Sequence, residues 1–351
     1  MTEPDHRSSP PRTPFAGLTP ELVLDALDGV GLRGDGRMLQ LNSYENRVFQ
    51  VFLEDARVVV AKFYRPARWS DEQILEEHGF AAELAAQEIP VVPPRVLARS
   101  DPAHLPLTLQ GTPPTLARVD AAGGLHRFAV ADRRAGRAPQ LDDLDEFAWI
   151  GRFIGRMHRV GSRSVFRHRK TLSVNDLGWA SRQWITDSGV IPDSLAAAWK
   201  DAAGRALDAV ESAFAGVGEL ASLRLHGDCH LGNVLWSDAG PHFVDLDDAM
   251  NGPAIQDLWM LLSGDPHEAA PQRRALLGGY EDFMEFDDRE LVLVEPLRTL
   301  RMIHHSAWLA RRWDDPEFPA AFPWFTGAAY WGQQTQQLHE QLANMHGDRS
   351  R

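Results

Sequence analysis

The chain has 351 residues, of which 44% are hydrophobic and 24% charged, and its formal net charge is −13 at pH 7. This length exceeds the size at which one hydrophobic core usually stops growing, so we expect two lobes. The negative charge disfavours a nucleic-acid partner, whose phosphates need a cationic surface, and no run of about 18 apolar residues offers a membrane span. The chain has one cysteine, so an intrachain disulfide is excluded and we expect a cytoplasmic protein. We also expect a monomer.

The N-terminal part of the chain predicts a hairpin of two strands between two helices. The first 15 residues are polar and rich in proline, without the apolar segment of a secretory signal, so we expect residues 1–18 to be disordered. Residues 19–27 start with a capping threonine and continue with helical periodicity. The β-rich runs 45–53 and 57–64 are separated by three residues, as in an antiparallel hairpin, and 70–87 has helical spacing of apolar residues.

The remainder of the chain predicts a small sheet followed by a mainly helical region. Short β-like runs at 115–119 and 125–130 would complete the sheet, and one β segment, 233–246, interrupts the later helices. Those helices are expected at 145–160, 194–214, 253–262, 273–283 and 291–313. The fold class is therefore predicted to be α+β and bilobal, with a β-rich N-lobe and a larger helical C-lobe. The expected boundaries are 1–18 for a disordered extension, 19–131 for the N-lobe, 132–140 for a hinge, 141–340 for the C-lobe and 341–351 for a disordered tail.

The strongest chemical signal is the motif HGDCHLGN at 226–233, which is followed by two short β runs and then by Asp245. Phosphoryl transfer from ATP needs a carboxylate near the attacking hydroxyl and oxygen ligands for the Mg²⁺ that bridges the nucleotide phosphates. Asp228 fits the first role, and Asn233 and Asp245 fit the second, because a hairpin would return Asp245 beside Asn233. The step of five from Asp228 to Asn233 also matches the kinase catalytic loop, with Gly227 in place of arginine.

Residues near this motif keep more than one interpretation. We expect His226 to hold the loop by hydrogen bonding rather than to transfer protons, and Cys229 to be a small packing residue. His230 either supports the site residues without contacting the substrate or lies on the surface. Asp257 either hydrogen-bonds back to the catalytic loop or favours the start of a helix.

The N-terminal half supplies candidate nucleotide-binding residues. Lys62 ends an apolar run, as expected of a strand lysine that reaches the α- and β-phosphates, although a lysine on an exposed sheet edge is the alternative. Glu76 and Glu77 are candidates for its ion-pair partner, and we favour Glu76 for the helix face on which it lies. The loop 42–46 would hold the phosphates through backbone N–H groups and the Ser43 hydroxyl, an assignment that depends on position because G-x-G-x-x-G is lacking.

Two further segments have two interpretations each. Seven Lys or Arg residues and no acid lie between Arg152 and Lys170, which indicates either a solvated helix face or a surface for an anionic substrate. The Trp residues between Trp308 and Trp331 are either core and lobe-packing aromatics or the wall of a substrate or partner site.

The motif H-G-D-x-H-x-x-N at 226–233 resembles the signature of the aminoglycoside phosphotransferase and choline kinase branch of the protein-kinase-like fold. Over roughly residues 20 to 335 the chain further resembles the bacterial stress response kinase A family, in LNSYENRV (41–48), AKFYRPARW (61–69), QILEEH (73–78), RLHGDCHLGNVLW (224–236), FVDLDDAMNGPAIQDLWML (243–261) and PEFPAAFPW (316–324). The resemblance implies a cytoplasmic Ser/Thr protein kinase that uses ATP and Mg²⁺. It implies Asp228 as proton acceptor, Asn233 and Asp245 as Mg²⁺ ligands, and Ser43 at the ATP site.

Three functions therefore remain under consideration. The first is a serine/threonine protein kinase of the stress response, with a protein hydroxyl as acceptor. The second is a small-molecule kinase for an aminoglycoside, choline, homoserine or sugar, and the third is a pseudokinase scaffold, which the joint presence of Lys62, Asp228, Asn233 and Asp245 disfavours. The residues themselves indicate phosphoryl transfer to a hydroxyl, whereas the protein acceptor comes from the family resemblance.

Overall fold

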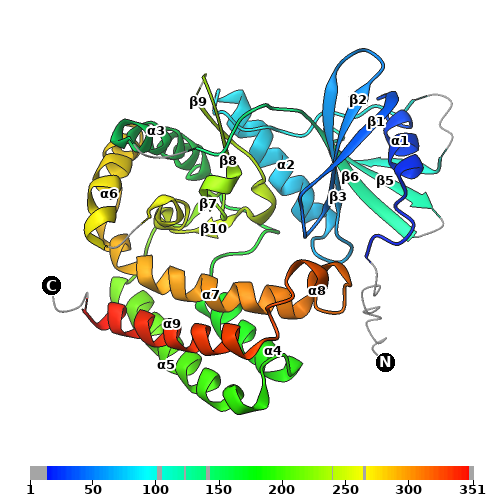
Figure 1. Ribbon diagram of the computed structural model, residues 1–351. Coiled ribbons are helices and arrows are strands. Elements are labelled where there is room, and N and C mark those ends of the chain that lie inside the picture. The colour runs from blue at the N-terminus through cyan, green and yellow to red at the C-terminus, as the bar shows by residue number, and fades with distance from the viewer. Residues whose placement is uncertain are drawn as a thin grey trace, which may run out of the picture. The chain divides into compact units, whose positions relative to one another are not determined.

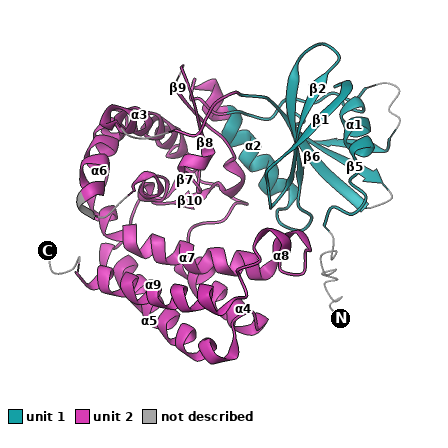
Figure 2. Ribbon diagram, in the orientation of Figure 1, with its two compact units in different colours: residues 1–82, 92–134 teal, residues 83–91, 135–351 magenta. Residues whose placement is uncertain are grey.

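The computed structural model describes residues 14–100, 105–121, 124–139, 143–238, 240–263 and 266–347. The chain divides into two compact units, which Figure 2 shows in different colours. Unit 1 comprises residues 1–82 and 92–134, and unit 2 comprises 83–91 and 135–351. We had expected the first lobe to run without interruption from 19 to 131, but residues 83–91 belong to the second unit. The expected extension (1–18) and tail (341–351) lie partly outside the described residues.

Unit 1 is built around an antiparallel sheet, which has six strands in the described part of the chain, in the order β1-β2-β3-β6-β5-β4. Helices α1 and α2 pack on this sheet (Figure 1). Its elements are α1 (Pro20–Asp28), β1 (Gly34–Leu41), β2 (Arg47–Leu53), β3 (Val58–Tyr64), α2 (Asp71–Ala86), β4 (Leu107–Gln110), β5 (Leu116–Ala121) and β6 (Gly124–Asp132). The first two helices and the β2–β3 hairpin confirm the prediction, whereas β1 and β4 were not predicted.

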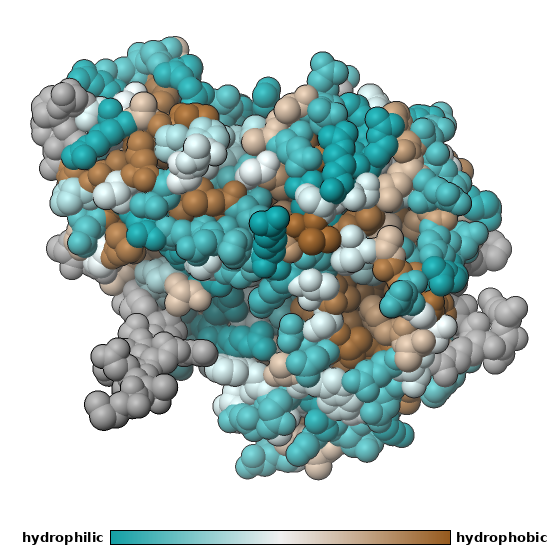
Figure 3. Space-filling view, turned by 180° about the vertical axis from the view of Figure 1, so that it is seen from behind, coloured by the Kyte–Doolittle hydropathy of each residue, from teal (hydrophilic) through white to brown (hydrophobic). Residues whose placement is uncertain are grey.

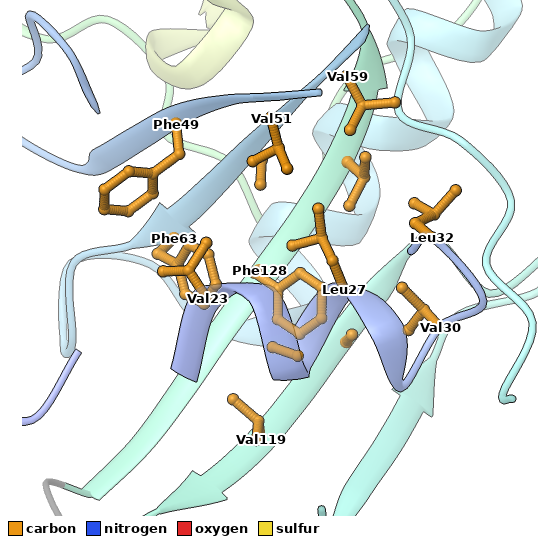
Figure 4. Packing of buried hydrophobic residues seen from close by; sticks show 14 of the residues in the cluster. Val23, Leu27, Val30, Leu32, Phe49, Val51, Val59, Phe63, Val119 and Phe128 are labelled. Carbon is orange, nitrogen blue, oxygen red and sulfur yellow. The ribbon is translucent and has the colours of Figure 1, made fainter. Parts of the chain in front are cut away.

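Strand β3 shows how the sheet positions its lysine. Val59, Ala61 and Phe63 point into the apolar core that α1 also enters, and Figure 4 shows this packing. Alternation of side chains along a strand then places Lys62 and Tyr64 on the opposite face. Tyr64 packs there in a second cluster that includes Ile74 of α2. Lys62 therefore lies on the face of the sheet that carries α2.

Unit 2 is mainly helical. Its helices and strands are α3 (Leu144–Gly161), α4 (Ala180–Ser188), α5 (Asp193–Val217), β7 (Leu223–Leu225), β8 (Val234–Ser237), β9 (Gly240–Phe243), β10 (Met250–Gly252), α6 (Pro266–Glu281), α7 (Val294–Arg311), α8 (Glu317–Ala321) and α9 (Ala328–Gly347). Strand pairs β7–β10 and β8–β9 are antiparallel. Helix α9 contains residues 341–347, which we had expected in a disordered tail, and the helix expected at 253–262 is replaced by two short 3₁₀ helices.

Two helix groups form the frame of unit 2. Helices α5, α7 and α9 pack together, and α3 packs along α6 (Figure 1). Trp199 and Trp331 meet edge to face in the first group, with ring centroids 5.5 Å apart, and both are buried. Trp331 is therefore a core residue, whereas Trp324 is exposed. The combination of a β-rich unit and a helical unit confirms the predicted α+β class.

The surface of the molecule carries mixed polarity. On the face shown in Figure 3, hydrophilic residues predominate and hydrophobic residues form separate patches. Among the helices of the described residues, none is long and apolar enough to cross a membrane.

Candidate functional site

The catalytic-loop motif connects β7 to β8, and the carboxylate of Asp257 anchors its start. The backbone N–H of His226 donates to Asp257 Oδ2 at 2.7 Å, and that of Gly227 donates to Oδ1 at 2.8 Å. Gln256 Nε2 also donates to the Gly227 carbonyl at 2.8 Å. Of the two roles that the sequence left open for Asp257, the structure shows the hydrogen bonds back to the loop.

Two side chains that the sequence analysis did not single out complete this anchor. His158 of α3 lies with Nε2 3.0 Å from Asp257 Oδ2 and with Nδ1 3.1 Å from the hydroxyl of Tyr280 in α6. Burial, with the nearby carboxylates of Glu290 and Asp257, raises the pKa of Tyr280, so its hydroxyl stays protonated. These contacts offset the desolvation of the Asp257 carboxylate, which is fully buried and would otherwise destabilise the fold. His158 follows Ile150 and Ile154 at steps of four, so it lies on the apolar face of α3. This spacing is the sequence signal that could have predicted a buried histidine.

Gly227 is required by the turn that exposes Asp228. Its φ is +85°, and a Cβ built on it would lie 2.1 Å from the carbonyl oxygen of Asp248. A side chain at this position would therefore clash with backbone as well as strain the turn. This explains why glycine stands where protein kinases carry arginine.

Asp228 presents its carboxylate between two basic side chains. Arg301 Nη1 of α7 donates to Oδ1, and His230 Nε2 lies 3.4 Å from Oδ2. Because the Gly232 N–H donates to His230 Nδ1 at 2.9 Å, the ring proton of a neutral His230 is on Nε2, facing Asp228. Burial alone would raise the pKa of Asp228, but the hydrogen bond from His230 and the charge of Arg301 outweigh it and hold that pKa well below its ordinary range. Asp228 is thus ionised at neutral pH.

Asn233 and Asp245 are brought together by the β8–β9 hairpin, as the sequence predicts. The Val244 N–H donates to the Asn233 carbonyl at 2.9 Å, which places the next residue, Asp245, beside Asn233. Asn233 Nδ2 donates to the Asp228 carbonyl at 3.0 Å, so its side-chain oxygen is the atom suited to a cation. Asp245 is exposed and has a left-handed backbone, with φ 62° and ψ 61°. Such strain in a non-glycine residue is common at functional sites.

The donor set fits a hard divalent cation. An amide oxygen and a carboxylate are ligands that Mg²⁺ accepts, and Mg²⁺ usually completes its shell with water and nucleotide phosphates. Within the described residues, no group of three or more His, Cys, Asp or Glu could hold a metal alone. A Mg²⁺ ion held by Asn233 and Asp245 would therefore take its remaining ligands from water and nucleotide phosphates.

His226 and Cys229 have structural contacts. His226 is buried, and its Nε2 lies 2.9 Å from the carbonyl oxygen of Val244, which joins the catalytic loop to the end of β9. Cys229 is buried as well, and burial raises the pKa of its thiol. A protonated, inaccessible thiol packs and does not act as a nucleophile.

Unit 1 holds the candidate nucleotide residues. Lys62 lies between Val48 and Ala129 of the neighbouring strands, on the α2 face. Glu77 is buried, with Oε2 3.7 Å from His78 Nε2, whereas Glu76 is half-buried, so the choice of Glu76 as the partner of Lys62 stays a prediction. Ser43 Oγ accepts from the Asn46 N–H at 3.3 Å and shapes the loop. Unit 1 thus carries Ser43, Lys62 and Glu76, and unit 2 carries Asp228, Asn233 and Asp245.

The chain is similar to known phosphotransferases in sequence and in fold. The sequence model of the phosphotransferase enzyme family matches residues 38–293. Two solved structures share the fold: an amicoumacin kinase (TM-score 0.64, 18% identity, 90% of this chain and 93% of that one) and a microcompartment-associated aminopropanol kinase (TM-score 0.69, 16% identity, 93% and 98%). The chain is thus a phosphotransferase of the protein-kinase-like fold.

Curated relatives narrow the family. The chain is 45% identical to stress response kinase A of Escherichia coli O157:H7, over 93% of each protein. It is 44% identical to the serine/threonine protein kinase RdoA of Salmonella typhimurium LT2, over 95% of each. The protein belongs to the stress response kinase A family, which confirms the resemblance found in the sequence.

Proposed function

We propose that the protein is a serine/threonine protein kinase that transfers the γ-phosphoryl group of ATP to a hydroxyl of another protein. The observation that carries this proposal is the ionised carboxylate of Asp228 in the loop that connects β7 to β8. The backbone carbonyl of Asp228 accepts a hydrogen bond from the Asn233 side chain, which keeps the two residues together. The names of the relatives support a protein acceptor and a role under stress. The net charge of −13 supports a partner other than nucleic acid, and we further propose a monomer that works in the cytoplasm.

Asp228 would act chiefly by positioning. A carboxylate with a depressed pKa is a weak base, but it accepts a hydrogen bond from the incoming hydroxyl and aims its oxygen at the γ-phosphorus. As the new P–O bond forms and the bond to the β-phosphate oxygen breaks, the hydroxyl proton passes to the Asp228 carboxylate and ADP leaves. Asn233 and Asp245 would hold Mg²⁺, which neutralises charge on the phosphates. Lys62 and Ser43 would bind the nucleotide phosphates from unit 1.

The decisive test is replacement of Asp228. Asp228→Asn keeps the shape of the side chain but removes the carboxylate, so we expect transfer of labelled phosphate from ATP to generic acceptor proteins to fall by roughly 10²–10⁴-fold. Asp187→Asn is a matched control, because Asp187 is exposed on α4 and bonds only its helix neighbour Gln183 in the contacts described. Unchanged melting temperatures would show that both variants fold.

The same assay distinguishes the alternative acceptors. Aminoglycosides, choline, homoserine and sugars would be offered beside the proteins. Transfer to one of these compounds and to none of the proteins would replace the proposal by a small-molecule kinase. Near-wild-type transfer by Asp228→Asn would remove Asp228 from the reaction.

A further inference from the structure

The proposed catalytic carboxylate is already engaged by an arginine. Arg301 of α7 donates to Oδ1 of Asp228, the same carboxylate that an acceptor hydroxyl has to reach. The Arg301 side chain is 45% exposed and that of Asp228 is 25% exposed. Because the Arg301 side chain is partly open to solvent, a competing carboxylate can reach it and take the place of Asp228.

Arg301 lies on the exposed side of α7. Its sequence neighbours Leu300 and Ile303 are buried and anchor the helix, whereas Arg301 points to the exposed side. His305 and Trp308 follow it at spacings of four and three, so the three residues lie on one helical face. The His305 and Trp308 rings stack, with centroids 5.6 Å apart and planes inclined by 27°. We call Arg301, His305 and Trp308 the α7 strip.

Positive charge lies beside part of the strip. Burial and then the charges of Arg311, Lys170, Arg312 and Arg301 lower the pKa of His304, which is next to the strip, to about 3. Burial and the charge of Arg301 likewise lower the pKa of His305, although Asp228 opposes this. Lys170 ends the basic segment 152–170 for which the sequence left an anionic substrate as one interpretation.

A guanidinium beside the acceptor position would select substrates by charge. Arg301 would repel polycationic acceptors such as aminoglycosides, whereas it would attract carboxylates. Arginine is suited to this task, since its planar guanidinium binds a carboxylate through two parallel hydrogen bonds.

Resting on the kinase function proposed above, we propose that Arg301 selects protein segments in which an aspartate or glutamate lies next to the acceptor serine or threonine. The substrate carboxylate takes Arg301 away from Asp228 by exchange of one ion pair for another. Oδ1 of Asp228 is then available to the acceptor hydroxyl. An acidic flank therefore contributes both to binding and to uncovering the base, and Arg301 is a specificity-determining residue.

The test uses the 351-residue chain, ATP, Mg²⁺ and three peptides of equal length with one central serine, flanked by glutamates, by alanines or by lysines. We expect kcat/KM at low salt to be at least about tenfold higher for the glutamate peptide than for the lysine peptide. The ratio should shrink towards 1 as the salt concentration rises, because exposed charges are screened. For the glutamate peptide, both a lower KM and a higher kcat are expected relative to alanine.

Three variants separate specificity from a structural effect. Arg301→Glu should lower transfer to the glutamate peptide and raise transfer to the lysine peptide, so that the preference is inverted. Arg301→Lys should still prefer the glutamate peptide, but with a smaller ratio of kcat/KM between the glutamate and lysine peptides. Arg205→Glu is the matched control, because Arg205 is exposed on α5 and pairs with Asp201 in the same helix. It should leave all three rates unchanged.

The outcomes that overturn the proposal are distinct from those that overturn the kinase function. Equal kcat/KM for the three peptides in the wild-type protein would reject charge selection and leave the kinase function standing. Equal loss on all peptides in Arg301→Glu would assign Arg301 a positioning role and would also reject it. Transfer to a small molecule with none to any peptide or protein would reject both.

Discussion

Glu290 is buried although it carries an ionisable group, and its burial sets a pH dependence. The Ile255 N–H donates to its Oε2 at 2.8 Å, which fixes the segment that ends in Asp257. Burial is the main cause that raises the pKa of Glu290 from 4.5 to about 7, and the hydrogen bond from Ile255 opposes it only in part. The folded protein therefore holds a proton on Glu290 over a pH range in which the unfolded chain has lost it.

This pKa predicts that Glu290→Gln changes stability only at higher pH. Because the folded-state pKa is raised, the stability linked to Glu290 is complete below pH 4.5 and is lost as the pH rises through 7. Glutamine stays neutral and can still accept the Ile255 N–H. The variant should match the wild type near pH 4.5 and gain on the order of 1–3 kcal/mol in unfolding free energy at pH 8, measured by chemical denaturation.

The exposed Glu340, which accepts from Gln336 in α9, offers a control. Glu340→Gln should show no comparable gain between the two pH values. A Glu290→Gln gain of equal size at pH 4.5 and pH 8 would mean that the benefit is one of packing and not of proton linkage.

At the scale of elements, helices α3 and α6 approach closely through glycines. A Cβ on Gly279 of α6 would lie 1.9 Å from the carbonyl oxygen of Ala148, and one on Gly151 of α3 would lie 2.0 Å from that of Leu276. Backbone cannot yield as a flexible side chain can, so the two helices would have to separate. This contact also carries the His158–Tyr280 pair that supports Asp257.

The contact predicts opposite effects for two adjacent glycines. Gly279→Ala should destabilise unit 2 by about 1–3 kcal/mol through overpacking, despite the better helix propensity of alanine. Gly278→Ala has nothing within 4 Å of its new Cβ, so it should be neutral or stabilising by up to about 1 kcal/mol. Thermal unfolding of the two variants decides the point, and equal effects would refute the close-contact argument.

The elements that could be predicted are those with a strong local pattern. Strands β2 and β3 alternate buried apolar with half-buried side chains, and the hairpin that follows the catalytic loop brings two neighbouring sequence segments together. Strand β1 (GDGRMLQL) is polar and mostly exposed, so nothing in its sequence marks a strand. The residues 253–262 have helical periodicity, but the buried contacts of Asp257 and Ile255 hold them in 3₁₀ turns.

The parts of the candidate site that could not be predicted are the contacts between distant segments. Asp228, Asn233 and Asp245 lie within 18 residues, so their spacing alone suggested a shared site. His158 lies 99 residues before Asp257, and Arg301 lies 73 residues after Asp228. Such pairs depend on how helices pack, and one sequence carries no signal for which distant side chains will meet.

At the scale of the whole molecule, unit 1 carries the candidate nucleotide residues and unit 2 the candidate Mg²⁺ ligands, so each unit can be tested for its share of ligand binding. A ligand that binds only the folded protein stabilises it by RT ln(1 + [L]/Kd), or about 2.7 kcal/mol at 100 times Kd. A non-hydrolysable ATP analogue with Mg²⁺ should therefore raise the melting temperature of the wild type. Lys62→Met in unit 1 should reduce that shift by weakening phosphate binding.

Asp245→Asn in unit 2 should remove the part of the shift that depends on Mg²⁺ while leaving the smaller effect of nucleotide alone, because a carboxylate binds Mg²⁺ far better than a second amide does. Lys200→Met, at an exposed position on α5, is the matched control for loss of a lysine charge and should retain the full shift. If Lys62→Met and Asp245→Asn both keep the wild-type response to nucleotide and Mg²⁺, neither residue holds the ligand. If only one of the two variants loses it, only the residue replaced in that variant contributes to ligand binding.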